Sequence, residues 1–183
     1  MLIGLYKKRY SQYKSAERKY LPEFVYGGID GTITTFAVVS GVVGASLSSS
    51  IVLILGFANL FADGFSMAVS NFLSMRSNNE ISKKSEKNEY KTATATFLAF
   101  VLMGFIPLLS FVVASVTGSS FLTENQFKYA FVLTGISLIT IGWQKGKVSG
   151  KSKTKSAFQT FLIGGIAALL AFAVGRILSG MVN

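Results

Sequence analysis

The sequence predicts an all-α, polytopic membrane protein with five transmembrane helices. Half of the 183 residues are hydrophobic, only 14% are charged, and the mean hydropathy is +0.50. Three long runs, residues 31–62, 92–123 and 156–175, carry no charged side chain. A helix needs about 20 apolar residues to cross the hydrocarbon core of a bilayer. The period-two alternation of a barrel strand is absent, so helices are the expected spanning elements.

The five spans are expected in one domain over residues 24–180. In order, they are placed at about residues 24–45, 51–75, 93–117, 127–143 and 157–179. The short polar turn at 44–50 predicts that the first two spans form a hairpin. Pro107 predicts a kink in the third span, because proline removes a backbone donor and clashes with the preceding turn. Trp143 marks one end of the fourth, where amphipathic rings favour the headgroup level. Gly164, Gly165 and Ala168 offer a small-residue surface on the fifth.

Lysine and arginine residues form three clusters, at positions 7–19, 76–91 and 145–155. Only Lys128 and Arg176 of the 18 basic residues lie elsewhere. The connections between these clusters are nearly free of positive charge. This alternation follows the positive-inside rule and predicts a cytoplasmic amino terminus and an outside carboxyl terminus. The net charge of +10 is therefore assigned to membrane topology, and nucleic acid is not expected as a partner.

Two polar segments flank the first two spans. Residues 1–23 form a basic cytoplasmic segment in which apolar and basic positions alternate. This pattern is typical of an interfacial amphipathic helix, although an extension of the first span or a solvated basic tail fits it too. Residues 77–90 are predicted to form a polar linker between the second and third spans.

Two aspartates, Asp30 and Asp63, are the only ones in the chain, and both lie in apolar segments. A charged side chain at the middle of a membrane costs roughly 3 kcal/mol and usually faces a bundle interior or an ion path. Asn59, Asp63, Met67 and Asn71 are spaced four apart, so they share one face of the second helix. Glu23 and Asp30 are seven apart on the first. The pattern predicts a cation pathway between these helices.

The types of side chain in this pathway indicate which cations it would bind. Oxygen atoms of Asp, Glu and Asn suit divalent ions, and the thioether of Met67 adds a preference for softer transition metals. The chain has no cysteine or histidine, so thiolate and imidazole metal sites are excluded. No permanently bound cofactor and no enzymatic activity are expected. Met67 also fits a simple packing role, and either aspartate fits a structural role as a helix cap or a paired charge.

The segments Phe24–Gly41 (FVYGGIDGTITTFAVVSG) and Gly56–Met67 (GFANLFADGFSM) resemble the paired signatures of the vacuolar iron transporter family. The resemblance covers about residues 22–180. It implies five helices per subunit, a homodimer, and exchange of Fe²⁺ for protons with tolerance of Mn²⁺. It also implies that Asp30 and Met67 line a metal path near the dimer axis, with Glu23 at its cytoplasmic mouth.

Two features differ from the family pattern. The acidic metal-binding segment common after the second helix is replaced by the short, mostly basic linker at 77–90. Asn71 stands where a glutamate is common, and Asp63 where a small residue is common. Compared with the family pattern, the acidic residue of the second helix thus lies about two turns earlier, at position 63 in place of position 71.

The function expected from the sequence is export of Fe²⁺, or Mn²⁺, from the cytosol in exchange for protons. Burial favours the protonated carboxyl group and a divalent cation favours the carboxylate, so metal and protons compete for the same aspartates. A passive divalent-cation channel and a non-transporting membrane interaction protein are the alternatives. The membrane of a bacterium or archaeon is expected in preference to a vacuole. Small residues of the first helix are expected to let two first helices approach each other at the dimer axis, namely Gly27, Gly31, Ala37 and Gly41.

Overall fold

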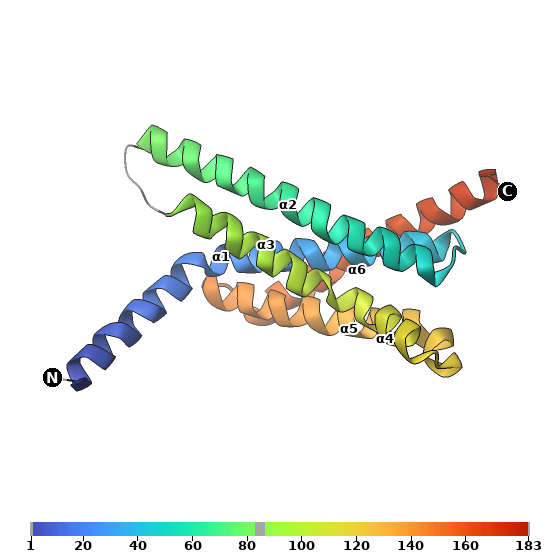
Figure 1. The fold of residues 1–183 in the computed structure, drawn as a ribbon, viewed down its shortest axis with the longest axis horizontal. Coiled ribbons are helices and arrows are strands. Elements are labelled where there is room, and N and C mark those ends of the chain that lie inside the picture. Colours follow the sequence, from blue (N-terminus) through green and yellow to red (C-terminus); the bar gives the residue numbers. More distant parts are fainter. Residues whose placement is uncertain (1, 83–86, 183) are drawn as a thin grey trace.

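The protein is a bundle of long helices that run side by side (Figure 1). The computed structural model describes residues 2–82 and 87–182, with side chains described in 19–82 and 87–181. Its elements are α1 (Leu2–Gly44), α2 (Ser49–Ser82), α3 (Glu89–Gly104), the 3₁₀ turn η1 (Ile106–Leu108), α4 (Leu109–Thr117), α5 (Ser120–Val148) and α6 (Lys153–Val182). Successive long segments alternate in direction, so their connections lie at the two ends of the bundle (Figure 1).

Four segments of the described chain are long and apolar enough to cross a membrane. They are Lys19–Gly44, Ser49–Ser82, Glu89–Thr117 and Lys153–Met181. The remaining helix, α5, has 29 residues, which also suffices in length. The predicted all-α membrane fold is therefore confirmed.

The third span is interrupted as Pro107 predicts. Its first part, α3, ends at Gly104, the turn η1 carries Pro107, and α4 continues from Leu109 to Thr117. The predicted hairpin is also confirmed, because α1 ends at Gly44 and α2 begins at Ser49. Ser46 makes this turn with a positive φ of 57°.

The predicted linker at 77–90 was too long, because α2 continues to Ser82 and α3 already begins at Glu89. Arg76 pairs with Glu80 at 3.0 Å, one turn apart, and such pairs support a solvated helix end. Asn88 caps α3, accepting a 3.0 Å bond from the Lys91 amide. Residues 83–86 lie outside the described chain. Residues 2–44 form one helix, and the amphipathic pattern predicted for residues 1–23 rests largely on side chains outside the described ones.

The first helix is the centre of the bundle, because α1 contacts α2, α3, α5 and α6. Phe36 of α1 packs with Leu60 of α2 and with Phe100, Leu108 and Phe111 of the third span in one buried cluster. The outer faces carry large exposed apolar side chains instead, most of all on α6. Apolar side chains on the outer faces as well as in the core are what a lipid environment permits.

For Gly27 and Gly31, the expected role in contacts between subunits was wrong, because both are buried against α3 of the same chain. A Cβ atom on Gly27 would lie 2.5 Å from the carbonyl oxygen of Thr96, and one on Gly31 would overlap the backbone of Phe100. Gly41 meets Ala171 of α6. Gly27 and Gly31 therefore bring α1 close to α3 of its own chain.

On α6 the expected small-residue surface is only partly used within the bundle. A Cβ atom on Gly164 would meet Leu138 of α5, and Ala168 is buried in the core. Gly165 points into open space. Of the three small residues predicted to make close helix contacts, only Gly164 and Ala168 therefore do so within the bundle.

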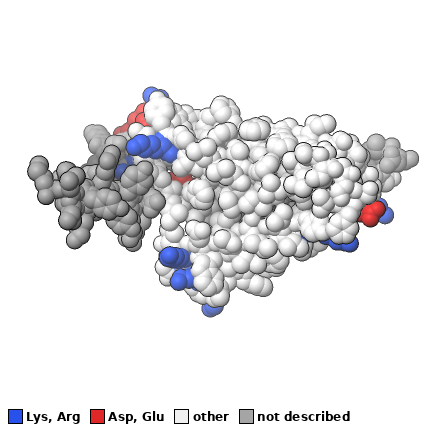
Figure 2. Space-filling view, turned by 60° about the horizontal axis from the view of Figure 1, so that its bottom comes forward, with Lys and Arg blue, Asp and Glu red and all other residues white. Residues whose placement is uncertain are grey.

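Charged residues gather at the ends of the bundle. Figure 2 shows basic side chains mainly at one end of the visible face and an almost uncharged middle. The α5–α6 turn lies at this end of the bundle (Figure 1). We call it the basic end.

Candidate metal-translocation site

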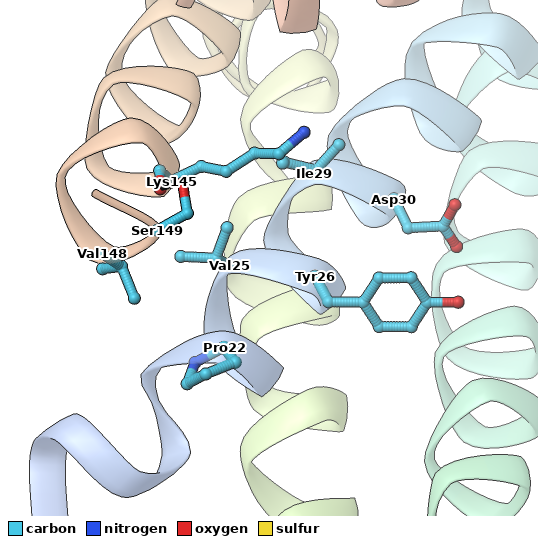
Figure 3. Close-up of a pocket in the computed structure, with 8 residues that line it drawn as sticks. All are labelled: Pro22, Val25, Tyr26, Ile29, Asp30, Lys145, Val148 and Ser149. Atoms are coloured by element: carbon cyan, nitrogen blue, oxygen red, sulfur yellow. Dashed lines mark hydrogen bonds between the residues drawn. The ribbon is translucent and has the colours of Figure 1, made fainter. Parts of the chain in front are cut away.

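Asp30 lies on the side of α1 that faces α2, and Asp63 is the aspartate of α2. Both residues are half-buried. Figure 3 shows the Asp30 carboxylate directed toward α2, together with the ring of Tyr26. The two carboxylates are near enough for their negative charges to repel each other. Within the described chain neither forms an ion pair with a basic residue.

The half-buried position of Asp63 follows from how α2 packs. Gly56, Leu60 and Gly64 form its buried face, with Gly56 against Leu108 and Gly64 against Phe100. Asn59 and Asp63 come one position before Leu60 and Gly64, so they lie about 100° around the helix. They therefore lie at the edge of the helix contact, between the packed face and the outer surface.

Met67 and Asn59 flank Asp63 by one turn on either side. Met67 is half-buried and packs against the apolar core cluster. The Nδ2 atom of Asn59 is buried and has no hydrogen-bond partner among the described residues. A buried donor without a partner costs about 1–3 kcal/mol, so this amide is available to a ligand, a water molecule or a second chain.

Asn71 is held by the third span. Its Nδ2 donates to Oγ1 of Thr96 at 2.6 Å, and Thr96 in turn donates to the carbonyl of Thr92 at 2.9 Å. These two threonines are buried, and they are not among the site residues predicted from the sequence. Their signal was present, since Thr92 and Thr96 are four apart in a segment without charges.

Glu23 lies about two turns, or roughly 10 Å, from Asp30 along α1 toward the basic end. It is only 7% exposed. Its Oε1 accepts a 2.6 Å bond from Lys87, a residue of the predicted polar linker. Its Oε2 is buried without a partner in the described chain.

The structure thus brings together Asp30 and Asp63, with Asn59 and Met67 on the same α2 stripe. Asn71 and Glu23 instead form hydrogen bonds with Thr96 and Lys87, respectively. The described residues contain no group of three or more acidic, cysteine or histidine side chains that could hold a metal. One copy of the chain therefore offers two carboxylates whose charges repel each other, fewer ligands than the six or more oxygen atoms that Ca²⁺ or Mg²⁺ takes.

Comparison with known proteins agrees with this architecture. The model of the VIT family matches residues 21–92 and 79–176. The vacuolar iron transporter of Toxoplasma gondii is 25% identical over 247 residues, covering 100% of this chain and 81% of the relative. Vacuolar iron transporter homolog 4 of Arabidopsis thaliana is 28% identical over 170 residues, covering 85% and 81%. The vacuolar iron transporter of Plasmodium berghei is 23% identical over 235 residues, covering 93% and 86%.

These relatives come from parasites and a plant, so the expected bacterial or archaeal source remains a prediction. The family match spans all of the helices that cross the bundle. This chain is therefore a member of the VIT family.

Proposed function

We propose that this protein is a membrane transporter that exports Fe²⁺, or Mn²⁺, from the cytosol in exchange for protons. The observation that carries the proposal is the pair Asp30 and Asp63, two half-buried carboxylates on neighbouring helices with no basic partner in the described chain. Uncompensated charge at this depth is costly. Binding of a proton or of a divalent cation removes this cost, and a carboxylate that holds one of them cannot hold the other.

The names of the relatives support iron as the cargo, because they are called vacuolar iron transporters. Met67 supports a soft transition metal over Mg²⁺, since sulfur is a poor ligand for hard cations. Oxygen atoms of Asn59, Asn71 and Glu23 are proposed as further ligands along the path. In this proposal Thr96 and Lys87 hold two of these side chains until the metal arrives.

The working unit is proposed to be a homodimer with the amino terminus in the cytosol. Ala58, Ala62, Ser66 and Ser70 form an exposed stripe of small residues on α2, directly beside Asp63. Small residues let helices approach closely in a membrane. A second copy placed on this stripe would double the carboxylates around one ion and cover the open edge of the site.

Uptake into liposomes that contain the purified full-length protein tests this function. Fe²⁺ under reducing conditions, Mn²⁺ and Mg²⁺ are added outside, and the internal metal concentration and pH are recorded together. Exchange predicts entry of Fe²⁺ and Mn²⁺ with a rise in internal pH, because protons leave. A passive channel would give metal entry without that rise at a clamped membrane potential. A non-transporting protein would give neither.

A further inference from the structure

A lysine of the α2–α3 connection lies at the first acid of the membrane-spanning part of α1. The Nζ atom of Lys87 is 2.6 Å from Oε1 of Glu23. Glu23 is only 7% exposed and lies about one helical turn inside the first spanning segment, which begins at Lys19. A cation that binds this carboxylate must therefore replace an ammonium group that already occupies one of its oxygen atoms.

The backbone that carries Lys87 is fixed by its neighbours. The carbonyl oxygen of Lys87 accepts a 3.0 Å bond from Nδ2 of Asn79 on α2. The amide of the next residue, Asn88, donates to the hydroxyl of Tyr20 on α1 at 3.3 Å, and the Asn88 side chain caps α3. Three helices thus fix the place from which the lysine side chain extends. The ammonium is therefore held near Glu23 even when it is not bound to it.

The second oxygen atom of Glu23 is not used by this pair. Oε2 is buried and has no hydrogen-bond partner in the described chain. An ionised carboxylate accepts hydrogen bonds at both oxygen atoms, and the ammonium of Lys87 satisfies only one of them. A divalent cation has twice the charge, so its Coulomb attraction to the carboxylate at a given distance is about twice that of the ammonium. A divalent cation therefore has a means to displace Lys87.

A monovalent ion lacks this advantage. It has the same charge as the ammonium, and it must come from solution, whereas Lys87 is linked to the site. Binding of a linked group is intramolecular and costs less entropy than binding of a free ion. The displaced ammonium has water within reach, because the Lys87 side chain is 25% exposed. The pair can thus open for a strongly attracted ion without leaving the lysine buried.

We propose that Lys87 is a tethered cation that occupies Glu23 in the absence of metal and makes this entrance selective for divalent over monovalent ions. Divalent ions displace Lys87 from Glu23, whereas monovalent ions leave the ion pair in place. The inference rests on the proposed transport function and adds a residue that determines which ions enter and at what concentration. Lys87 does not touch the metal, so it acts through Glu23.

Mn²⁺ uptake by Lys87→Gln tests this inference, because the glutamine amide still donates a hydrogen bond to Glu23 but carries no charge. Initial rates are measured in liposomes that contain the full-length protein, over a range of Mn²⁺ concentrations. The background ion is either Na⁺ or the bulky organic cation N-methylglucamine, at equal ionic strength. We expect Lys87→Gln to lower the half-saturating Mn²⁺ concentration about fivefold, the factor for an ion pair of about 1 kcal/mol. We also expect Na⁺ to inhibit this variant and not the unaltered protein.

Two further variants separate the ion pair from general effects of charge. Lys87→Arg restores the positive charge and should restore both the half-saturating concentration and the insensitivity to Na⁺. Lys91→Gln removes an exposed basic residue four positions later, on α3, and should leave both unchanged. Equal effects of Lys87→Gln and Lys91→Gln would overturn the inference, because they would indicate diffuse repulsion of cations. An unchanged half-saturating concentration, or insensitivity to Na⁺, in folded Lys87→Gln protein would overturn it too.

Mn²⁺ binding separates a failure of this inference from a failure of the transport proposal. The electron paramagnetic resonance signal of free Mn²⁺ measures binding to the purified full-length protein in detergent, where no transport is needed. Tighter binding by Lys87→Gln that is lost on adding Glu23→Gln would support the inference, even if liposomes took up no metal and the transport proposal failed. Uptake by the unaltered protein with equal Mn²⁺ binding by all three proteins would overturn the inference and leave the transport proposal standing.

Discussion

Lys87 Nζ lies 2.6 Å from Oε1 of Glu23, and this ion pair joins the chain just before α3 to the start of the first membrane span. The side chains are 25% and 9% exposed, respectively, so the pair is largely removed from water. Glu23 is thereby compensated in the resting protein, whereas Asp30, two turns further along α1, has no basic partner in the described chain. In the proposed transport, a metal ion would therefore have to displace a lysine at Glu23 but not at Asp30.

Lys87→Met should destabilise the protein, because it leaves Glu23 buried without its counter-ion. Loss of one partner of a buried pair costs about 3–5 kcal/mol, and we expect roughly 2–3 kcal/mol here because Lys87 is partly exposed. Unfolding in mixed micelles of increasing denaturing detergent measures the change. Glu23→Gln combined with Lys87→Met should recover part of the loss. If the double variant is as unstable as the sum of the two single ones, the pair does not contribute as described.

Gly31→Ala should also destabilise the protein, because the added Cβ atom would overlap the backbone of Phe100. Overpacking of this kind costs roughly 1–3 kcal/mol. Gly165→Ala is the matched control, since nothing lies within 4 Å of the added atom and alanine favours a helix by up to about 1 kcal/mol. The same unfolding assay compares them. Equal stability of the two variants would contradict the close contact between α1 and α3.

The fold was predictable because its signals are local. Charge-free runs, three basic clusters and Pro107 are each visible in the sequence, and they fix the number of spans, their alternation and the break in the third. The partners of the glycines were not predictable in the same way. Gly27 and Gly31 indicate a close contact, but small residues carry no information about which helix makes it. Only the packing of α3 on α1 settles that question.

The candidate site shows the same limit. The spacing of Asn59, Asp63, Met67 and Asn71 places them correctly on one stripe of α2. Asn71 nevertheless donates to Thr96, because an amide inside a membrane takes the nearest hydroxyl acceptor of a neighbouring helix. Lys87 pairs with Glu23, which is 64 residues away in the sequence. Helical periodicity relates only residues within one helix, so it could not predict this pair.

Met67→Leu should change the selectivity of transport and leave the fold intact, because leucine is nearly isosteric but has no sulfur. Uptake of Fe²⁺ into liposomes is measured in the presence of increasing Mg²⁺ or Mn²⁺. We expect the variant to lose preference for Fe²⁺ over Mg²⁺. Unchanged competition would return Met67 to the packing role that its contact with the core also fits.

Single cysteines on the exposed small-residue stripe of α2 should crosslink between subunits. The native chain contains no cysteine, so Ala62→Cys and Ser66→Cys each introduce one reactive site. Dimer bands after mild oxidation in membranes are the readout. Gly165→Cys, on an open face of α6, is the control that should stay monomeric. Crosslinking at Gly165 alone would place the subunit contact on α6 and leave Asp63 without a second copy beside it.

The central claim is that Asp30 and Asp63 carry both metal and protons, and flux through their amide variants tests it most directly. Asp30→Asn and Asp63→Asn keep the side-chain shape and remove the charge, and Glu124→Gln removes an exposed acid elsewhere. Fe²⁺ uptake and internal pH are recorded together in liposomes that contain equal amounts of folded protein. We expect near-complete loss of both signals in Asp30→Asn, a strong reduction of both in Asp63→Asn, and little change in Glu124→Gln. Normal Fe²⁺ uptake with a normal pH rise in folded Asp30→Asn protein would contradict it.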